Sequence, residues 1–300
     1  MLPLAAYTAK DWSRLRPLTL AYRTAARTRQ MRRYQAVPPA DMAGFEAMAA
    51  KLHGQPLAIS IAFNQPWVID WQQRFIARNM HDLAYMVADN SSIPAQAAEI
   101  ERLCAERDVP YVRLPGNPGT SASRSHTLAL NWVYERVVKP LDPPIFAFLD
   151  HDLFPVVPVA PSRDLDGQPF YGRLVEQPKG WSLWAGYCVF DRAAIAGYEL
   201  DFSQCWYRDL ASGGANYERL YRHFDRSALR FAHSWYQEVP SDEAPRGSLL
   251  ERHDGWLHMI DASGHGSLGT DRRPAMERLL AAIEADPEKV ATWPASSRTL

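Results

Sequence analysis

"FAFLDHDLFP", residues 146–155, is the stretch that decides the fold prediction for this chain. An apolar run that predicts a buried strand ends in Asp150, His151 and Asp152, and apolar residues resume at Leu153. In open α/β sheets, ligands bind where the strands end, at their carboxyl edge. The stretch therefore predicts a central strand with a polar site at its end.

Three similar apolar runs precede this stretch, and patterns of helical spacing separate them. The predicted strands cover residues 57–63, 83–87 and 110–114. The predicted helices cover residues 68–80, 93–104 and 130–137. Strands that alternate with helices of this length indicate an α/β fold with a mostly parallel, Rossmann-like sheet and helices on both faces.

The alternation weakens in the second half of the chain. Residues 169–175 and 181–190 resemble strands that are too close together for a helix between them, so we expect a smaller antiparallel portion there. Short helices are predicted at 192–199 and 216–224, and a longer one around 276–283.

Composition limits the class of protein. The chain has 300 residues, 47% of them hydrophobic, and a formal net charge of −1, which argues against a general affinity for nucleic acid. Its three cysteines lack the spacing of a zinc site or a disulfide framework, which favours a reducing compartment. No apolar run approaches the roughly 18 residues of a membrane span. We therefore expect a cytoplasmic protein.

Charge is unevenly distributed, because residues 1–40 carry eight basic side chains and one acid, Asp11. Residues 12–35 predict a helix with a modest apolar face among arginines. Such a helix could lie against an anionic membrane at its inner, cytoplasmic face. It could equally be a solvated helix that packs on the rest of the protein.

Asp150 and Asp152 suggest a metal site. Side chains two residues apart on a strand point the same way, so these two can face one ligand while His151 points elsewhere. Like charges that close repel each other unless a cation lies between them, and oxygen ligands of this kind suit Mg²⁺ or Mn²⁺. The alternative is a pair of carboxylates that cap a turn.

Five segments together resemble a known family. They are AFNQPWVIDWQQRFI (62–76), YMVADNSS (85–92), SHTLALNWVYE (125–135), FAFLDHDLFPV (146–156) and WAGYCVFDRAAI (184–195). In order and spacing they are similar to the GT-A glycosyltransferases of the broad family-two type, above all to bacterial enzymes that build surface polysaccharides. The resemblance covers roughly residues 56–265.

The resemblance implies a domain organisation. A catalytic GT-A domain would span residues 55–272, with a nucleotide-binding half at 55–152 and an acceptor half at 153–272. A basic helical extension, 1–54, would precede it, and a helix and tail, 273–300, would follow.

The resemblance also implies the residues that bind the nucleotide. Phe63 and Asn64, at the end of the first strand, would lie beside the base, and Asp89 would contact the base or the ribose. Ser125 and His126 stand where a helix should begin, a place that favours an anion, so they are candidates for contact with the nucleotide sugar. A helix cap beside a surface histidine is the alternative for this pair.

For the metal, the resemblance implies direct binding by Asp152, and contact by Asp150 with the metal or the ribose, often through water. A late histidine frequently completes the set in this family. His258 is the better match, and His265 is the second choice.

One expected residue is missing. Inverting members of the family use a carboxylate as general base, often an Asp just before paired glycines, and this chain has Ala211 there, in "LASGGANYERL". Asp209, Glu218 and Asp191 are the candidate substitutes. An inverting reaction, a retaining reaction and no catalysis at all remain open.

The function expected from the sequence is metal-dependent transfer of a sugar, in the manner of a hexosyltransferase. The donor would be a nucleotide-diphosphate sugar, a UDP-sugar by default, and the acceptor a saccharide or a lipid-linked saccharide. One alternative is a metal-dependent phosphohydrolase, because His-Asp doublets occur at 81–82, 151–152 and 253–254. The other is a non-catalytic partner subunit that binds a nucleotide sugar, which Ala211 makes credible.

Overall fold

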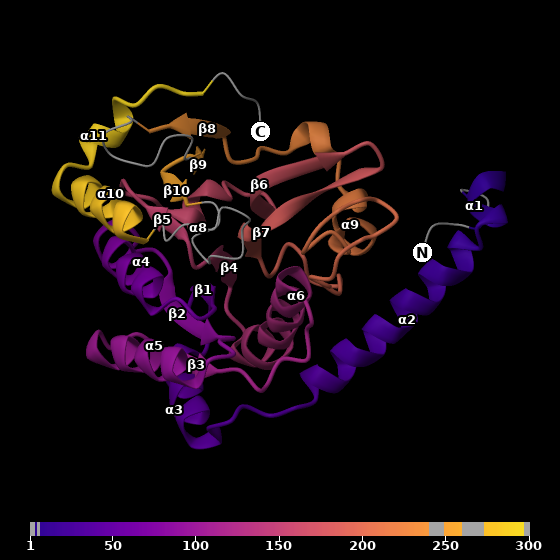
Figure 1. Cartoon of the computed structure of the whole chain (residues 1–300), viewed down its shortest axis with the longest axis horizontal. Helices are drawn as coiled ribbons and strands as arrows, with labels where there is room; N and C mark the ends of the chain where they lie inside the picture. The colour runs from indigo at the N-terminus through magenta and orange to yellow at the C-terminus, as the bar shows by residue number, and fades with distance from the viewer. Residues whose placement is uncertain (1–3, 5–6, 240–248, 260–272, 297–300) are drawn as a thin grey trace.

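A six-stranded sheet forms the centre of the computed structural model, which describes residues 4, 7–239, 249–259 and 273–296 (Figure 1). Its strands are β1 (Leu57–Ala62), β2 (Ala84–Asp89), β3 (Tyr111–Arg113), β4 (Ile145–Asp150), β6 (Phe170–Gln177) and β7 (Gly180–Asp191). They lie in the order β3-β2-β1-β4-β7-β6. Neighbours from β3 to β4 are parallel, and of the six described strands β7 alone runs in the opposite direction. The predicted α/β fold with a mostly parallel sheet is confirmed.

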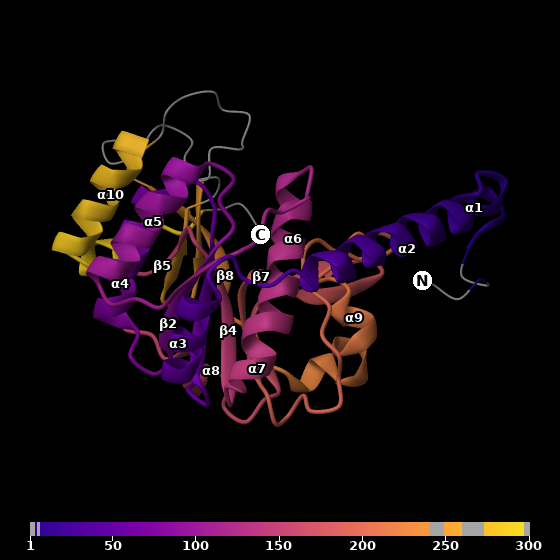
Figure 2. The same ribbon diagram turned by 90° about the horizontal axis from the view of Figure 1, so that it is seen from below.

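Helices cover both faces of this sheet (Figure 2). They are α3 (Met42–Leu52), α4 (Pro66–Asn79), α5 (Pro94–Glu106) and α6 (Ala122–Val133), which continues as a π-helical turn (Tyr134–Val138) and α7 (Lys139–Leu141). One face of the sheet packs on α4 and α5, through Ile69 and Ile100. The other face packs on α6 and α3, through Leu128 and Leu52. Since both faces are covered, every residue of β1 is buried, which explains its uninterrupted apolar sequence.

A smaller antiparallel sheet stands beside the first, as expected for the second half. It contains β5 (Leu153–Pro155), β10 (Trp256–His258), β9 (Leu249–His253) and β8 (Ser234–Glu238), in that order. Helix α10 (Arg273–Ala285) packs with α4 against this sheet. Because β5 begins directly after Asp152, the chain passes from the large sheet to the small one at the D-x-D segment.

Short helices complete the described chain: α8 (Pro161–Asp164), α9 (Asn216–Arg219), two 3₁₀ turns (Tyr221–His223 and Arg226–Ala228) and α11 (Glu288–Ala291). The helix predicted at 216–224 is thus confirmed in two short pieces. The helix predicted at 192–199 is wrong, because this segment forms turns. Gly197, whose φ is 93°, interrupts any helical path there.

The N-terminal helices are α1 (Ala9–Ser13) and α2 (Arg16–Gln35). Figure 1 shows α2 projecting from the body of the molecule toward α1. Met31 and Tyr34, in its last turns, are buried against the core, whereas Leu15, Leu18 and Tyr22 are exposed. None of the helices in the described part of the chain combines the length and the apolar content that a membrane crossing requires.

Candidate functional site

A cavity of about 270 Å³ lies where β1 and β4 end and α6 begins. Its lining residues are Ile61, Phe63, Asn90, Ala122, Ser123, Ser125, His126, Asp150, His151, Asp152 and Ser212. A wider groove of about 710 Å³ shares four of these residues, Phe63, Asn90, Ala122 and Ser125, so the two hollows adjoin. The site therefore lies at the carboxyl edge of the parallel strands, as the sequence predicts.

Strand pairing brings a distant histidine to the D-x-D segment. In the pairing of β10 with β5, His258 is opposite Leu153, and the Met259 N–H donates to the Asp152 carbonyl at 2.9 Å. The His258 Nε2 atom lies 3.5 Å from Asp152 Oδ1. Ligand atoms of Asp150, Asp152 and His258 all lie within 4.8 Å of one another.

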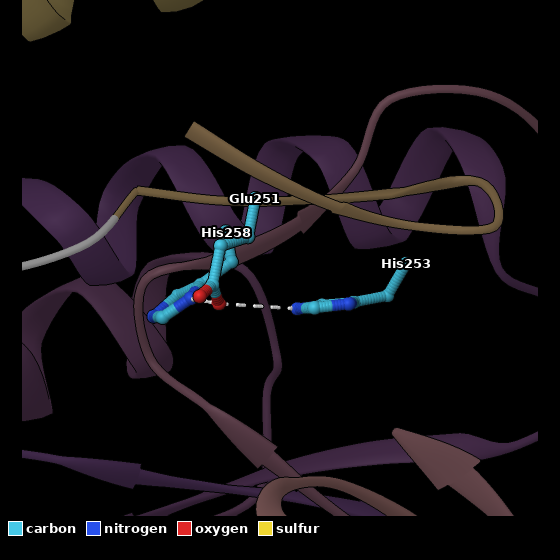
Figure 3. Close-up of side chains that lie close together, drawn as sticks. All are labelled: Glu251, His253 and His258. Atoms are coloured by element: carbon cyan, nitrogen blue, oxygen red, sulfur yellow. Dashed lines mark hydrogen bonds and ion pairs between the residues drawn. The ribbon is translucent and has the colours of Figure 1, made fainter. Parts of the chain in front are cut away.

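A second set of side chains orients His258. Its Nδ1 atom lies 2.8 Å from Glu251 Oε2, and Arg173 donates to the other Glu251 oxygen at 3.1 Å. His253 approaches the same carboxylate, with Nε2 3.4 Å from Oε2 (Figure 3). A histidine that gives one ring N–H to a carboxylate presents its other nitrogen to a metal. The donor set of two carboxylates and one imidazole thus fits Mn²⁺ or Mg²⁺.

Glu251, His253 and His258 are themselves close enough to hold an ion. All three are almost fully buried, however, and only the set with Asp150 and Asp152 borders the cavity among the described residues. The cavity set is therefore the better metal candidate.

Electrostatics couples His258 to these acids. Burial lowers its pKa, but the charges and hydrogen bonds of Asp152 and Glu251 outweigh burial and raise the pKa to about 10. Burial would raise the pKa of Asp152, but the charge and hydrogen bond of His258, together with the charge of His151, outweigh burial, so that pKa is lowered. Without a metal, the imidazole is consequently protonated at neutral pH and supplies the positive charge that the acids require.

Gly186 of β7 leaves room for this cluster. A Cβ atom at this position would lie 2.6 Å from Asp150 Oδ2. The ring of Trp184 packs on His258, with the ring centroids 4.6 Å apart. Glycine is therefore required where the neighbouring strand passes the Asp150 carboxylate.

His151 departs from expectation. The strand ends at Asp150, and residues 151–152 form a turn, so the alternation of side chains stops there. His151 lines the cavity with both aspartates, and its Nδ1 atom accepts the Phe63 N–H at 3.2 Å. The expectation that it points elsewhere is wrong.

Asp89 is enclosed by the chain itself. Its carboxylate is fully buried and accepts hydrogen bonds from the Ser91 N–H (2.8 Å), the Tyr111 hydroxyl (2.9 Å) and Arg113 (3.0 Å). It lines neither the cavity nor the groove. Because the chain itself satisfies this acid, Asp89 braces the end of β2, and Asn90 and Ser91 reach the groove in its place.

Of the other predicted nucleotide contacts, some line the cavity and one does not. Phe63, Ser125 and His126 line the cavity, and His126 Nε2 lies 3.4 Å from Asp150 Oδ1. Asn64 does not line it; its side-chain oxygen accepts the N–H groups of residues 92 and 93, at 2.9 and 3.0 Å. Asn64 therefore ties the end of β1 to the loop after β2.

The candidate bases lie apart from the cavity. Asp191 pairs with Ile145, at the opposite end of the sheet, and accepts the Ala194 N–H. Asp209 is exposed in a turn. Glu218 is ion-paired with Arg208 and Arg222; burial would raise its pKa, but these arginines lower it, which weakens it as a base.

Ala211 is exposed, and the residue after it, Ser212, lines the cavity instead. Sequence reasoning missed Ser212, and it also missed Glu251. His265 lies outside the described residues.

Among the described residues, the His-Asp doublets do not combine in one candidate metal-binding set. Asp82 lies before β2, at the amino end of the sheet, where it accepts the Ser162 N–H at 2.7 Å. Asp254 sits in the turn between β9 and β10 and accepts from Tyr171. The phosphohydrolase reading is therefore not supported by the arrangement of these residues.

Comparisons with known proteins find matches among solved structures. No family model matches the chain, and a search of curated proteins gives no match. Among solved structures, the apo WbbM bifunctional glycosyltransferase is 11% identical, with a TM-score of 0.32 over 53% of this chain and 33% of its own. The mannosyltransferase PcManGT from Pyrobaculum calidifontis, in complex with GDP-Man and Mn²⁺, is 12% identical, with a TM-score of 0.40 over 89% of this chain and 81% of its own. The chain thus spans about a third of the length of WbbM, and at these scores any function rests on the geometry of the site itself.

Proposed function

We propose that this protein is a metal-dependent glycosyltransferase that moves a sugar from a nucleotide-diphosphate sugar to a saccharide or lipid-linked acceptor. The observation that carries the proposal is the cluster of Asp150, Asp152 and His258 at the carboxyl edge of the sheet. A groove large enough for a nucleotide adjoins it. Synthesis of a surface polysaccharide is the setting that the sequence resemblance suggests.

Each member of the cluster has a role in this proposal. Asp152 and His258 hold a divalent ion, and Asp150 reaches it or the ribose. Such an ion, when bound, neutralises the charge that develops on the diphosphate leaving group. Glu251 keeps the His258 Nε2 atom directed toward the ion, because it accepts a hydrogen bond from the Nδ1–H group.

The groove offers polar groups for the nucleotide. Phe63 provides an apolar surface, and Asn90 and Ser91 provide polar atoms beside it. The first turn of α6 borders the same space, and backbone N–H groups at a helix start favour an anion. A UDP-sugar stays the default donor, and a GDP-sugar is the comparison to test first.

The lack of a clear base supports a second candidate function. Among the described residues, Asp150 and Asp152 are the acids that line the cavity, and the proposed metal would occupy both. A partner subunit that binds a nucleotide sugar without transferring it would have this arrangement.

One experiment tests the proposal and separates the two candidates. The full chain is incubated with UDP-sugars and GDP-sugars, with Mn²⁺ or with a chelator, while binding and release of nucleotide diphosphate are followed. Slow Mn²⁺-dependent release from one donor is the expected result. Mn²⁺-dependent binding without release would favour the partner subunit, and the absence of any Mn²⁺-dependent binding would overturn both.

Contact with an anionic membrane through residues 12–35, at the cytoplasmic face, belongs to the same proposal. Leu18 and Tyr22 are exposed one turn apart on the projecting part of α2, among arginines, and the exposed Leu15 stands just before the helix. Binding to vesicles with about 30% anionic lipid, weakened by 0.5 M salt, is the expected result. If equal amounts of the protein bind to neutral and to anionic vesicles, the membrane contact is contradicted.

A further inference from the structure

A second cavity, of about 410 Å³, lies between α2, α6 and the segment 201–222. Its lining residues are Thr24, Arg27, Thr28, Arg124, Asp201, Ser203, Gln204, Cys205, Trp206, Tyr207, Ala215, Glu218, Arg219 and Arg222. It is close to the first cavity, because the side chain of Gln204, which lines it, donates to Ser123, which lines the other. Four arginines and two acids face this space.

Arg124 is the unusual member, because it is only 8% exposed and forms no ion pair, although Asp201 acts on it at longer range. Its guanidinium donates to the Gln30 side-chain oxygen at 3.2 and 2.9 Å and to the Arg27 carbonyl at 3.0 Å. Within the described part of the chain, no carboxylate is in ion-pair range of it. Burial of a cation without a nearby anion is costly, so the charge requires a partner from elsewhere.

Arg27 is the second arginine in the lining of this cavity that forms no ion pair with a described residue. Its guanidinium lies over the ring of Trp206, with the carbon 3.9 Å from the ring centroid. A stacked guanidinium keeps the N–H groups of its edge available for an oxyanion. Arg27 and Arg124 also repel each other, which lowers the pKa of Arg124 further after the larger effect of burial.

The other two arginines that line the cavity are ion-paired, although Glu218 is shared with Arg208. Arg219 pairs with Asp201 at 3.4 Å, and Arg222 pairs with Glu218 at 2.6 Å. Two positive charges are therefore left over, on Arg27 and Arg124. A single dianion would neutralise both.

We propose that this cavity binds a phosphoryl group of the acceptor, held by Arg27 and Arg124 beside the donor cavity. A phosphate matches the spare charge and can accept hydrogen bonds from Arg27 and from Nη1 of Arg124, whose Nε and Nη2 already donate to Gln30 and the Arg27 carbonyl. A carboxylate with one charge would do this less well. The assignment of the phosphoryl group to an acceptor rests on the proposed function. The anion site itself does not depend on that function.

The test measures binding of inorganic pyrophosphate to the full chain by calorimetry, with a chelator present. The chelator removes any metal from the donor cavity, so metal-bridged binding of the probe does not contribute, and the variants assign the remaining binding to the arginines. Arg124→Gln and Arg27→Gln are each expected to weaken binding at least about tenfold, as for a lost charge-assisted hydrogen bond. Arg29→Gln, which removes an exposed charge from the same helix, should change it less than about twofold.

The outcomes separate clearly. Absence of saturable pyrophosphate binding by the wild type, or equal weakening by Arg29→Gln and Arg27→Gln, would overturn the proposal. Stronger binding of glucuronate than of pyrophosphate would overturn the phosphoryl assignment. If Arg124→Gln does not fold, Arg27→Gln, whose side chain is less buried, decides alone.

Two further probes identify the source of the phosphoryl group. Tighter binding of octyl phosphate than of glucose 1-phosphate would assign a lipid-linked acceptor, and the reverse order a soluble sugar phosphate; either result supports the site. Mn²⁺-dependent binding of nucleotide sugars is measured separately. Failure of the proposed function therefore leaves pyrophosphate binding intact, and failure of this proposal leaves nucleotide binding intact.

Discussion

The carboxyl ends of β2 and β4 look alike in sequence but differ in structure. Each strand ends in an aspartate, and both were expected to contact a ligand. Asp89 is enclosed by Ser91, Tyr111 and Arg113 and is fully buried. By contrast, Asp150 is 25% exposed toward a cavity, and the side chains within ion-pair range of Asp150 and Asp152 are histidines, His126 and His258. The difference teaches that a strand-end acid is available to a ligand only where the chain does not supply a permanent counter-charge.

The largest expected effect comes from Asp152→Asn. This change removes a proposed metal ligand while it keeps the shape of the side chain, and His258 retains Glu251 as its partner. Mn²⁺-dependent nucleotide binding should weaken about 100-fold or more. The variant should still fold, with a lower melting temperature in chelator because His258 loses one of its two acidic partners. Asp191→Asn, a strand-end acid at the opposite end of the sheet, is the matched control and should leave binding unchanged. Mn²⁺ affinity that survives Asp152→Asn would end the metal proposal.

Asp89→Asn should produce the opposite result, and so sharpens the comparison. The change removes the charge that Arg113 requires and disturbs buried hydrogen bonds at the edge of the sheet. The free energy of unfolding, measured by urea denaturation, should fall by about 1 to 3 kcal/mol. Mn²⁺ affinity of the folded variant should stay close to that of the wild type. A stable variant that has lost nucleotide affinity would show instead that Asp89 does contact the ligand.

This pair of acids also marks the limit of prediction from sequence. For both acids, the sequence predicts that a buried strand ends there and that polar residues follow. This is possible because an apolar run and its interruption are local features of the sequence. The partners of Asp89 could not, because Tyr111 and Arg113 belong to β3 and reach it only through the pairing of β2 with β3. The position of His151 was also not predictable, since it depends on where β4 stops.

The role of Glu251 could have been found in the sequence. "RHDGWLH", 252–258, contains an Asp-Gly pair between β-prone segments, which is a strong hairpin signal. A two-residue turn at Asp254 and Gly255 pairs His258 with Glu251, as the structure has it. This hairpin reaches the D-x-D segment, however, only because β10 pairs with β5. Strand β5 has three residues, too few for the sequence to indicate a strand or its partner.

Asp152 and Asp89 should also differ in their response to pH. His258, the partner of Asp152, can lose its proton when a metal binds, whereas Arg113, the partner of Asp89, stays charged. The pKa of His258 is raised to about 10 in the metal-free protein, so one proton must leave as Mn²⁺ binds. Below that pKa, Mn²⁺ affinity should rise about tenfold per pH unit, here measured between pH 6.5 and 8.5. His258→Gln should bind more weakly and with a flatter dependence. A wild-type affinity that is constant over this range would mean that His258 is not a ligand.

The same raised pKa predicts a change in stability without metal. The folded pKa of His258 lies above the ordinary value of 6.5, so its ion pairs stabilise the fold fully below about pH 6.5. That stabilisation is lost as the pH rises toward 10. In a chelator, the melting temperature of the wild type should therefore fall from pH 7 to pH 10 by more than that of His258→Gln. Saturating Mn²⁺ should reduce the difference, and parallel curves for the two proteins in chelator would contradict the coupling.

The smallest expected effect belongs to Glu251→Gln, which asks whether the orientation of His258 matters. Glutamine can still accept the Nδ1 proton of His258 through its amide oxygen, but it lacks the charge that makes the imidazole a better ligand. Mn²⁺ affinity should fall by about tenfold, the lower end of what loss of such a partner costs. At saturating Mn²⁺, nucleotide affinity should return to the wild-type value, because Glu251 itself does not line the cavity. A loss of nucleotide affinity that excess Mn²⁺ does not restore would show that Glu251 acts on the groove and not through His258.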